Sequence, residues 1–242
     1  MNTYLILGGS SGIGLAVSRK LAKENDIVIV SHSEKKLEQA KEMIDPKHCC
    51  ETFACDLGKP ENITHVFQFI KERNMRLDGM VYCAGVAPLC LLKDNDISQM
   101  ENVFRLNLFS FIEACRYFYQ EDISVEGSKI VGIASITAHS SGYRQVLYGS
   151  SKAAMVAASR LMAKELMNRK IKINCLSPGS VLTDLLMGLY ESREALEAKV
   201  QEKQPLGVIP SERVADAVMM LLSPVADYIS GNEFVYDGGF LL

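Results

Sequence analysis

Short apolar runs alternate with longer amphipathic stretches along the whole chain, and this alternation constrains the fold more than any other feature. Most of the runs are continuously apolar, which is typical of strands covered on both faces. Repeated strand–helix alternation favours a parallel, doubly wound α/β sheet. The predicted strands cover residues 3–7, 26–31, 50–55, 77–83, 129–135, 172–177 and 232–237, and the predicted helices cover 13–24, 34–44, 60–74, 96–122, 148–169 and 211–222.

Length and composition narrow the class of protein. The 242 residues suit one large α/β domain over 1–242, and the net charge of -3 without a basic run gives no reason to expect nucleic acid or an anionic membrane as a partner. The seven cysteines lack metal-like spacing, so we expect reduced thiols, no metal site and a cytoplasmic protein. The first apolar stretch is too short for a signal peptide, and no window approaches the roughly 20 apolar residues of a membrane span.

A glycine-rich stretch, LGGSSGIG at 7–14, joins the first predicted strand to the first predicted helix. Such a turn directs backbone N–H groups and the positive helix end at one point, which suits a pyrophosphate. Glycines let the backbone turn tightly and let phosphates approach it. The spacing is neither the usual dinucleotide fingerprint nor a P-loop. A tight structural turn is the alternative interpretation.

Further candidates lie where other predicted strands end. Cys83, Ala84 and Gly85 close the fourth strand, and their small side chains let a ligand pass close to the backbone. Asp56 closes the third strand, where it either contacts a ligand or caps a helix. Ser135 closes the fifth strand, and its hydroxyl can bind a carbonyl oxygen or cap a loop.

Tyr148 and Lys152 are four residues apart in a predicted helix, which places them on one face. A nearby ammonium lowers the pKa of a phenol from about 10, so the pair suits general acid/base chemistry. A packed tyrosine beside a solvated lysine is the alternative. Asn107 lies within an apolar helical stretch, where a buried amide needs hydrogen bonds, so it either stabilises the core or holds a catalytic water.

Together with INCLSPGSVLT at 173–183 and DGG at 237–239, these segments resemble the short-chain dehydrogenase/reductase family over nearly the whole chain. Within that family the chain looks like the 3-oxoacyl-[acyl-carrier-protein] reductases. The resemblance implies a single Rossmann domain with a parallel sheet of about seven strands, helices on both faces and a substrate lid near 184–203. Leu7 and Cys83 depart from the family's usual threonine and asparagine, which puts the rigidity of these loops in question.

The resemblance also implies roles for individual residues. Tyr148 donates a proton to the substrate carbonyl, Lys152 lowers the pKa of Tyr148 and binds the nicotinamide ribose, Ser135 polarises the carbonyl, and Asn107 holds a relay water. The segment 178–183 covers the nicotinamide end and Asp56 the adenine. The residues expected to bind the cofactor are Gly8, Ser10, Ser11, Gly12, Ile13, Ser31, His32, Ser33, Asp56, Leu57, Cys83, Ala84, Gly85, Tyr148, Lys152, Pro178, Gly179, Val181 and Thr183.

The end of the second predicted strand bears on the choice of cofactor. An acidic residue there binds the ribose 2′-hydroxyl of NAD, whereas this chain has Ser31, His32 and Ser33. All three can hydrogen-bond a phosphate, so NADP(H) is favoured and NAD(H) is the alternative. Lys35 and Lys36 follow, and they and His32 can equally be ordinary surface residues.

We therefore expect an oxidoreductase that transfers a hydride between NADP(H) or NAD(H) and a ketone or secondary alcohol, with a 3-oxoacyl thioester as one candidate substrate. Hydroxysteroid, sugar or other alcohol dehydrogenases of the same family are alternatives, as is a non-catalytic cofactor-sensing protein. A methyltransferase is disfavoured because it needs an acid after the second strand. Small residues along helix 148–169 suit packing within the chain or against a second subunit, and the family's usual dimer or tetramer favours a homo-oligomer, with a homotetramer expected.

Overall fold

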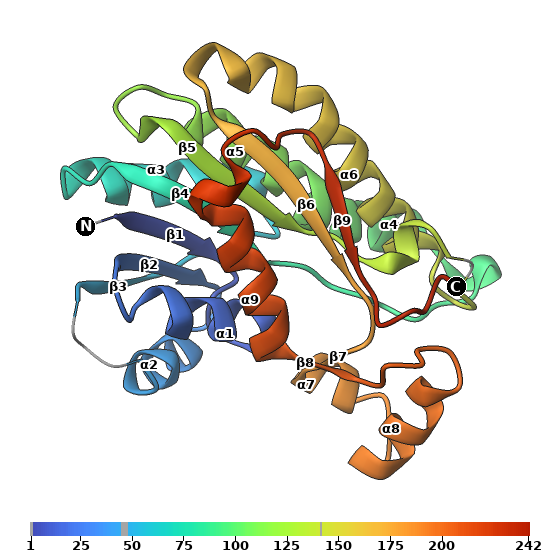
Figure 1. Ribbon diagram of the computed structural model, residues 1–242. Coiled ribbons are helices and arrows are strands. Elements are labelled where there is room, and N and C mark those ends of the chain that lie inside the picture. Colours follow the sequence, from blue (N-terminus) through green and yellow to red (C-terminus); the bar gives the residue numbers. More distant parts are fainter. Residues whose placement is uncertain (1, 45–47, 141) are drawn as a thin grey trace.

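The computed structural model describes residues 2–44, 48–140 and 142–242. At its centre lies a seven-stranded sheet in the order β3-β2-β1-β4-β5-β6-β9, and every pair in it is parallel (Figure 1). The strand order changes direction between β1 and β4, and in open α/β sheets ligands bind outside the carboxyl ends of the strands at such a point, so we expect the functional site there. The strands are β1 (Thr3–Leu7), β2 (Asp26–Ser31), β3 (Cys50–Ala54), β4 (Leu77–Tyr82), β5 (Ser124–Ile133), β6 (Lys172–Pro178) and β9 (Glu233–Tyr236).

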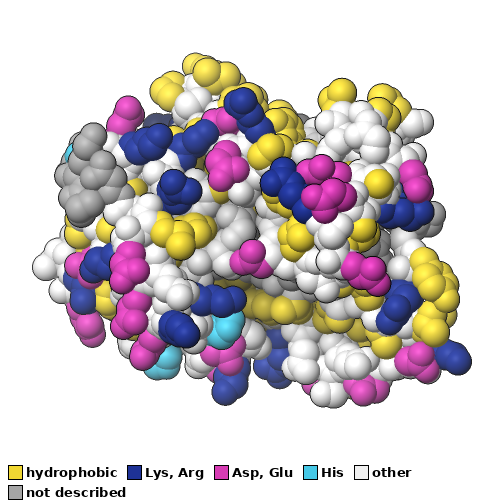
Figure 2. All heavy atoms as spheres, turned by 90° about the horizontal axis from the view of Figure 1, so that it is seen from below, with side chains coloured by type: hydrophobic (Ala, Val, Ile, Leu, Met, Phe, Trp, Pro, Cys, Tyr) yellow, Lys and Arg dark blue, Asp and Glu magenta, His cyan; other side chains and the backbone are white. Residues whose placement is uncertain are grey.

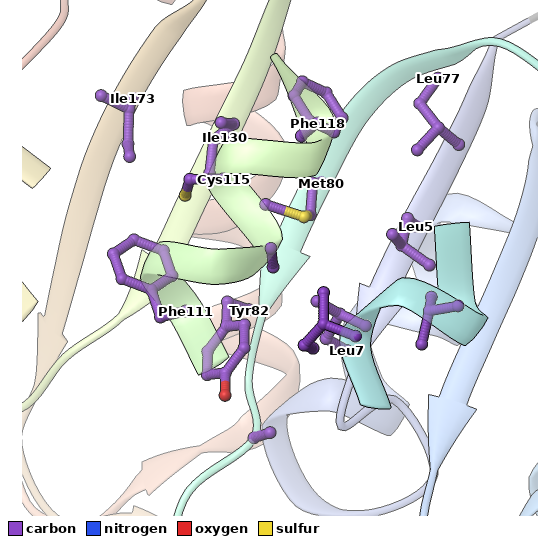
Figure 3. Close-up of a cluster of buried hydrophobic side chains, with 14 of the residues drawn as sticks. Leu5, Leu7, Leu77, Met80, Tyr82, Phe111, Cys115, Phe118, Ile130 and Ile173 are labelled. Carbon is purple, nitrogen blue, oxygen red and sulfur yellow. The ribbon is translucent and has the colours of Figure 1, made fainter. Parts of the chain in front are cut away.

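Helices cover both faces of the sheet, as the doubly wound prediction requires (Figure 1). Side chains alternate between the faces along each strand, so Ile6 packs in one core and its neighbours Leu5 and Leu7 pack in the other. The core around Ile6 lies under α1 (Gly12–Leu21), α2 (Glu34–Glu42) and α9 (Ser211–Leu222). The core around Leu5 and Leu7 lies under α3 (Ile63–Glu72), α4 (Ile97–Phe104), α5 (Ser110–Phe118) and α6 (Val146–Leu166). Figure 3 shows this core, where the rings of Tyr82 and Phe111 meet.

The predicted helix over 96–122 is wrong as a continuous α-helix. Asp96 begins α4 with a capping box to Gln99, but a π-helical turn, Arg105–Phe109, then separates α4 from α5. The long-range contacts of this turn, described below, stabilise the irregular backbone. Short 3₁₀ turns also lie at Pro60–Asn62, Leu92–Asp94, Ile136–Ala138, Met167–Arg169 and Pro224–Ala226.

The strand prediction at 129–135 places the start of β5 too late. Ser124 already pairs with Leu77, and the register then shifts before Gly79 pairs with Lys129. The polar residues of this first part do not form the apolar run that indicates a buried strand.

The helical pattern at 184–203 forms two helices, α7 (Asp184–Met187) and α8 (Arg193–Gln201). They project beside the carboxyl end of β6 (Figure 1). A small parallel sheet of β7 (Val181–Leu182) and β8 (Ile209–Pro210) joins the beginning of this segment to its end. Residues 181–210 therefore form an excursion from the main sheet, and the pairing of β7 with β8 holds the two ends of this excursion together.

The charged side chains are mixed on the surface (Figure 2), which is consistent with the small net charge of -3. Acidic and basic side chains are interspersed across the face seen in Figure 2. Within residues 2–44, 48–140 and 142–242, no helix is both long and apolar enough to cross a membrane. The same ranges contain no cluster of three or more His, Cys, Asp or Glu side chains suited to a metal ion.

Candidate active site

The glycine loop folds tightly between β1 and α1. Gly8 has a φ of +85°, and a Cβ on it would lie 2.6 Å from the backbone nitrogen of Ala84. A Cβ on Gly14 would lie 2.1 Å from the carbonyl oxygen of Gly8. Both contacts are shorter than real side chains allow, so the loop can close against itself and against the end of β4 only with glycine at these positions.

The first turn of α1 suits an anion. Ser11 is the N-cap residue, yet its side chain makes no capping hydrogen bond, and the turn contains no acidic residue. The backbone N–H groups at this helix end are therefore not bound by the side chain of their own N-cap residue, which leaves them available to an anion. Gly12 begins the helix, and Ile13 packs partly against the core below. These features fit a pyrophosphate.

The end of β2 distributes its three polar residues differently. The Ser10 hydroxyl donates to the Ser31 hydroxyl at 2.7 Å, which ties the glycine loop to β2. The Ser33 hydroxyl accepts from the backbone N–H of Lys36 at 3.3 Å and caps α2. His32 lies between them with an exposed side chain. His32 is thus the residue of this group that faces solvent at the strand end.

Asp56 is exposed, and its Oδ1 accepts from the backbone N–H of Gly58 at 2.9 Å. This contact lies in a turn after β3 and is not a helix cap, because Lys59 is the N-cap residue of the 3₁₀ turn that follows. Leu57 is buried in the core, and its carbonyl oxygen accepts from the Ser110 hydroxyl. Leu57 can contact a ligand only through its backbone.

Lys152, Tyr148 and Ser135 come together between α6 and β5. Lys152 is only 4% exposed, its Nζ donates to the carbonyl oxygen of Ile133 at 2.7 Å, and it lies 5.8 Å from the centre of the Tyr148 ring. Burial lowers the pKa of Lys152 from 10.5 to about 8, because a low-polarity environment disfavours the ammonium. The Lys152 ammonium therefore loses its proton at a pH much closer to neutral than an ordinary lysine does.

The predicted lowering of the Tyr148 pKa by Lys152 does not describe this structure. Burial raises the pKa of Tyr148, and a hydrogen bond from Ser135 partly opposes the rise. The half-buried phenol thus keeps its proton at neutral pH. The desolvation of the ring is the larger of these two effects, and the Lys152 ammonium donates to the Ile133 carbonyl oxygen.

Asn107 lies in the π-helical turn and is fully buried. Its Oδ1 accepts from the backbone N–H of Val86, and its Nδ2 donates to the Val86 carbonyl oxygen and to the Ser151 hydroxyl, each at 2.9 Å. Ser151 in turn donates to the carbonyl oxygen of Tyr148. The amide therefore links the end of β4 to α6, and the Tyr82 hydroxyl supports the same turn through the carbonyl oxygen of Leu106.

The segment after β4 lies against these groups. A Cβ on Gly85 would lie 3.2 Å from Asn107 Oδ1 and 3.5 Å from Lys152 Nζ. Ala84 contacts the glycine loop, and the backbone N–H of Cys83 donates to the carbonyl oxygen of Leu7 at 2.7 Å. Burial raises the pKa of the Cys83 thiol to about 12. Backbone contacts thus hold the two positions at which this chain departs from the family pattern.

The segment 178–183 connects β6 with the excursion. Pro178 ends β6, and Val181 is buried in β7. The Thr183 hydroxyl caps α7, and its methyl group lies 3.2 Å from where a Cβ on Gly12 would be. The structure thus brings this segment to the glycine loop.

Sequence reasoning missed Gln204, which is fully buried next to Gly179. A Cβ on Gly179 would lie 2.3 Å from Gln204 Oε1. No motif points to this glutamine. The only signal is a polar residue directly before the PLG turn at 205–207.

Comparisons with known proteins agree with this geometry. A family model described as Enoyl-(Acyl carrier protein) reductase matches residues 8–241. Carbonyl reductase family member 4 of Xenopus tropicalis is 32% identical over 98% of this chain and 97% of its own. The human 3-oxoacyl-[acyl-carrier-protein] reductase is 29% identical over the same shares. The solved Pseudomonas aeruginosa RhlG/NADP active-site complex is 25% identical, with a TM-score of 0.90 over 100% of this chain and 96% of that one.

The chain belongs to the short-chain dehydrogenase/reductase family. Membership makes it an oxidoreductase of the NAD(P)-dependent dehydrogenase/reductase class. In this short-chain dehydrogenase/reductase, Ser135 follows the carboxyl end of β5, whereas Asn107 lies in the π-helical turn and Tyr148 and Lys152 lie on α6.

Proposed function

We propose that the protein interconverts a ketone and a secondary alcohol, with NADP(H) preferred over NAD(H). The observation that carries the proposal is the buried Lys152, one helical turn from Tyr148 and beside Gly85, next to a glycine loop that suits a pyrophosphate. A lysine that has no carboxylate partner among the residues that the structure describes is rarely this buried without a functional reason.

The described residues fit a dinucleotide. The uncapped N-terminus of α1 and the loop containing Gly8, Ser10, Ser11, Gly12 and Ile13 would hold the pyrophosphate. Ser31, His32 and Ser33 would lie near the adenosine ribose, and Asp56 and Leu57 near the adenine. Segments 83–85 and 178–183, with Tyr148 and Lys152, would surround the nicotinamide half. When bound, the nicotinamide supplies or accepts the hydride.

The side chains around Tyr148 would handle the proton. The raised pKa of Tyr148 keeps the phenol protonated, so it can donate to a carbonyl oxygen as the hydride arrives. Ser135 would hydrogen-bond the same oxygen, and Lys152 retains donors beyond its bond to Ile133 for ribose hydroxyls. The Asn107 amide is occupied by Val86 and Ser151, so any relay water would use its remaining acceptor capacity.

Preference for NADP(H) rests on the end of β2. Residues 30–33 carry no acid that would repel a 2′-phosphate, and exposed His32 with Lys35 and Lys36 gives that position a basic character. The name of the Pseudomonas aeruginosa complex, which contains NADP, agrees with the proposal.

The proposed substrate is a 3-oxoacyl thioester or another small carbonyl compound, as the names of the human and Xenopus relatives suggest. Residues 184–203 would form the lid over it, within a single catalytic domain of 1–242. Hydroxysteroids and sugar alcohols are competing substrates. A cofactor sensor without activity is disfavoured because both Tyr148 and Lys152 are present.

The test follows NADPH and NADH absorbance with 3-oxoacyl thioesters, steroid ketones, diketones and sugar ketones. Turnover with one cofactor and one substrate class supports the proposal. Tyr148→Phe is expected to lower kcat by several orders of magnitude and leave nucleotide affinity nearly unchanged, because it removes only the proton donor. Near-normal turnover by Y148F would remove Tyr148 from this role.

We also propose a homo-oligomer, a dimer or tetramer, in the cytoplasm. Phe109 and Ile112 near the start of α5 and Leu161 on α6 are exposed apolar side chains, which suits a subunit contact. The seven free cysteines suit a reducing compartment. Light scattering at micromolar concentration should give a multiple of 26.7 kDa, and a monomer mass would contradict the oligomer.

A further inference from the structure

Gln204 occupies the point where three segments of the chain cross. It follows α8, its backbone N–H donates to the carbonyl oxygen of Val200, and its side chain is fully buried. Segment 178–183 lies on one side, and the C-terminal turn at 237–239 lies on another. A buried amide needs all its hydrogen bonds satisfied, so its partners show what it holds in place.

The amide binds the backbone of Ser180 twice. Ser180 N–H donates to Gln204 Oε1 at 2.8 Å, and Gln204 Nε2 donates back to the Ser180 carbonyl oxygen at 3.3 Å. The second Nε2 hydrogen goes to the carbonyl oxygen of Gly207. The side chain therefore acts as a rung between the beginning and the end of the excursion, next to the β7–β8 pair.

Glycines make room for this contact. Cβ atoms on Gly179 and Gly238 would lie 2.3 Å from Gln204 Oε1 and 2.8 Å from Gln204 Cγ. Gly238 also has a φ of +61°, and its carbonyl oxygen accepts from the backbone N–H of Leu206 at 3.0 Å. The C-terminal turn is thus packed onto the glutamine.

Ser180 is the centre of the segment that runs from the end of β6 to Thr183, which touches the glycine loop at Gly12. We propose that Gln204 is a positioning residue that fixes segment 178–183 against the nicotinamide half of the bound dinucleotide and couples it to the lid. The inference rests on the proposed function, since it assumes that this segment faces the nicotinamide. Gln204 itself lies behind the segment and touches no reacting atom.

If Gln204 positions segment 178–183, its replacement should weaken the binding of the nicotinamide half of the cofactor and leave the binding of the adenosine half unchanged. Gln204→Leu keeps the side-chain volume and removes the amide, so segment 178–183 loses both hydrogen bonds between Ser180 and Gln204. Binding of NADPH is expected to weaken roughly tenfold, the equivalent of one or two lost hydrogen bonds. Binding of 2′,5′-ADP, which lacks the nicotinamide, is expected to stay within about twofold, and the value of kcat should fall as well.

The measurement is a titration of wild type, Q204L and Q120L with NADPH, followed by fluorescence, and with 2′,5′-ADP as competitor. Gln120 is a matched control because its side chain binds Lys71 at the amino edge of the sheet. Unchanged NADPH affinity in Q204L, or equal weakening of both ligands, overturns the inference. Where Q204L does not fold, Gln204→Met, which keeps the side-chain length, makes the same comparison. A wild type that binds neither NADPH nor NADH removes the proposed function first, and this inference with it.

Discussion

Replacing Lys152 with methionine keeps most of the side-chain volume at a position that is 4% exposed and removes the ammonium. Burial lowers the pKa of Lys152 from 10.5 to about 8, so at pH 7 the folded protein bears a charge that the unfolded chain keeps in water. This difference in pKa corresponds to roughly 3 kcal/mol. Loss of the hydrogen bond to Ile133 offsets about 1 to 2 kcal/mol. We expect Lys152→Met to be more stable than wild type by on the order of 1 to 2 kcal/mol at pH 7, although it loses activity.

The advantage of Lys152→Met should depend on pH in a defined direction. Below pH 8 the lysine is protonated in both states, so the difference in unfolding free energy has its full size. Between about 8 and 10.5 the unfolded wild type binds more protons than the folded one, so wild-type stability rises with pH relative to the variant. Above that window the advantage is gone.

Urea unfolding at pH 7 and pH 10, without added nucleotide, measures both effects. Lys164→Met on the same helix is the control, because Lys164 is exposed and its replacement removes no buried ammonium. A K152M variant less stable than wild type at pH 7 refutes the reasoning. So does a stability difference that is the same at both pH values.

Three further substitutions test other parts of the site. His32→Asp should raise the ratio of kcat/KM for NADH over NADPH, because a carboxylate repels the 2′-phosphate, and an unchanged ratio contradicts the proposed preference. Tyr82→Phe removes the donor to the Leu106 carbonyl oxygen and should cost about 1 to 3 kcal/mol in urea unfolding, with kcat lowered through Asn107. Gly14→Ala places a Cβ 2.1 Å from the carbonyl oxygen of Gly8, so calorimetry should show a lower Tm and titration no nucleotide binding; native binding would contradict the loop geometry.

The sheet was predictable because its strands are buried on both faces. Strand β1 matches the predicted 3–7 and β2 matches 26–31, since continuous apolar runs have no alternative to the core. The glycine loop was predictable for a related reason, because positive φ and close backbone approach admit little else than glycine.

The rest depends on partners far along the chain. The break in helix 96–122 is stabilised by Asn107 with Val86 and by Tyr82 with Leu106, contacts that no local periodicity reveals. Gln204 is similar, because its importance comes from Ser180, which lies 24 residues away. The sign of the Tyr148 pKa shift also escaped prediction, because it depends on the depth of burial and not on the spacing to Lys152.

The π-helical turn at Arg105–Phe109 has a consequence for how this part of the chain tolerates change. A residue advances about 100° around an α-helix, so removing one residue from the turn would rotate all that follows by that angle. The side chains of α5 that now fill the core, among them Phe111 and Phe118, would turn toward its flank. Asn107 can keep its hydrogen bonds while Phe111 and Phe118 stay in the core only if the π-helical turn keeps all five of its residues. A single-residue deletion in this turn would therefore be more harmful than most substitutions, because the chain could then keep either the contacts of Asn107 or the packing of α5 in the core, but not both.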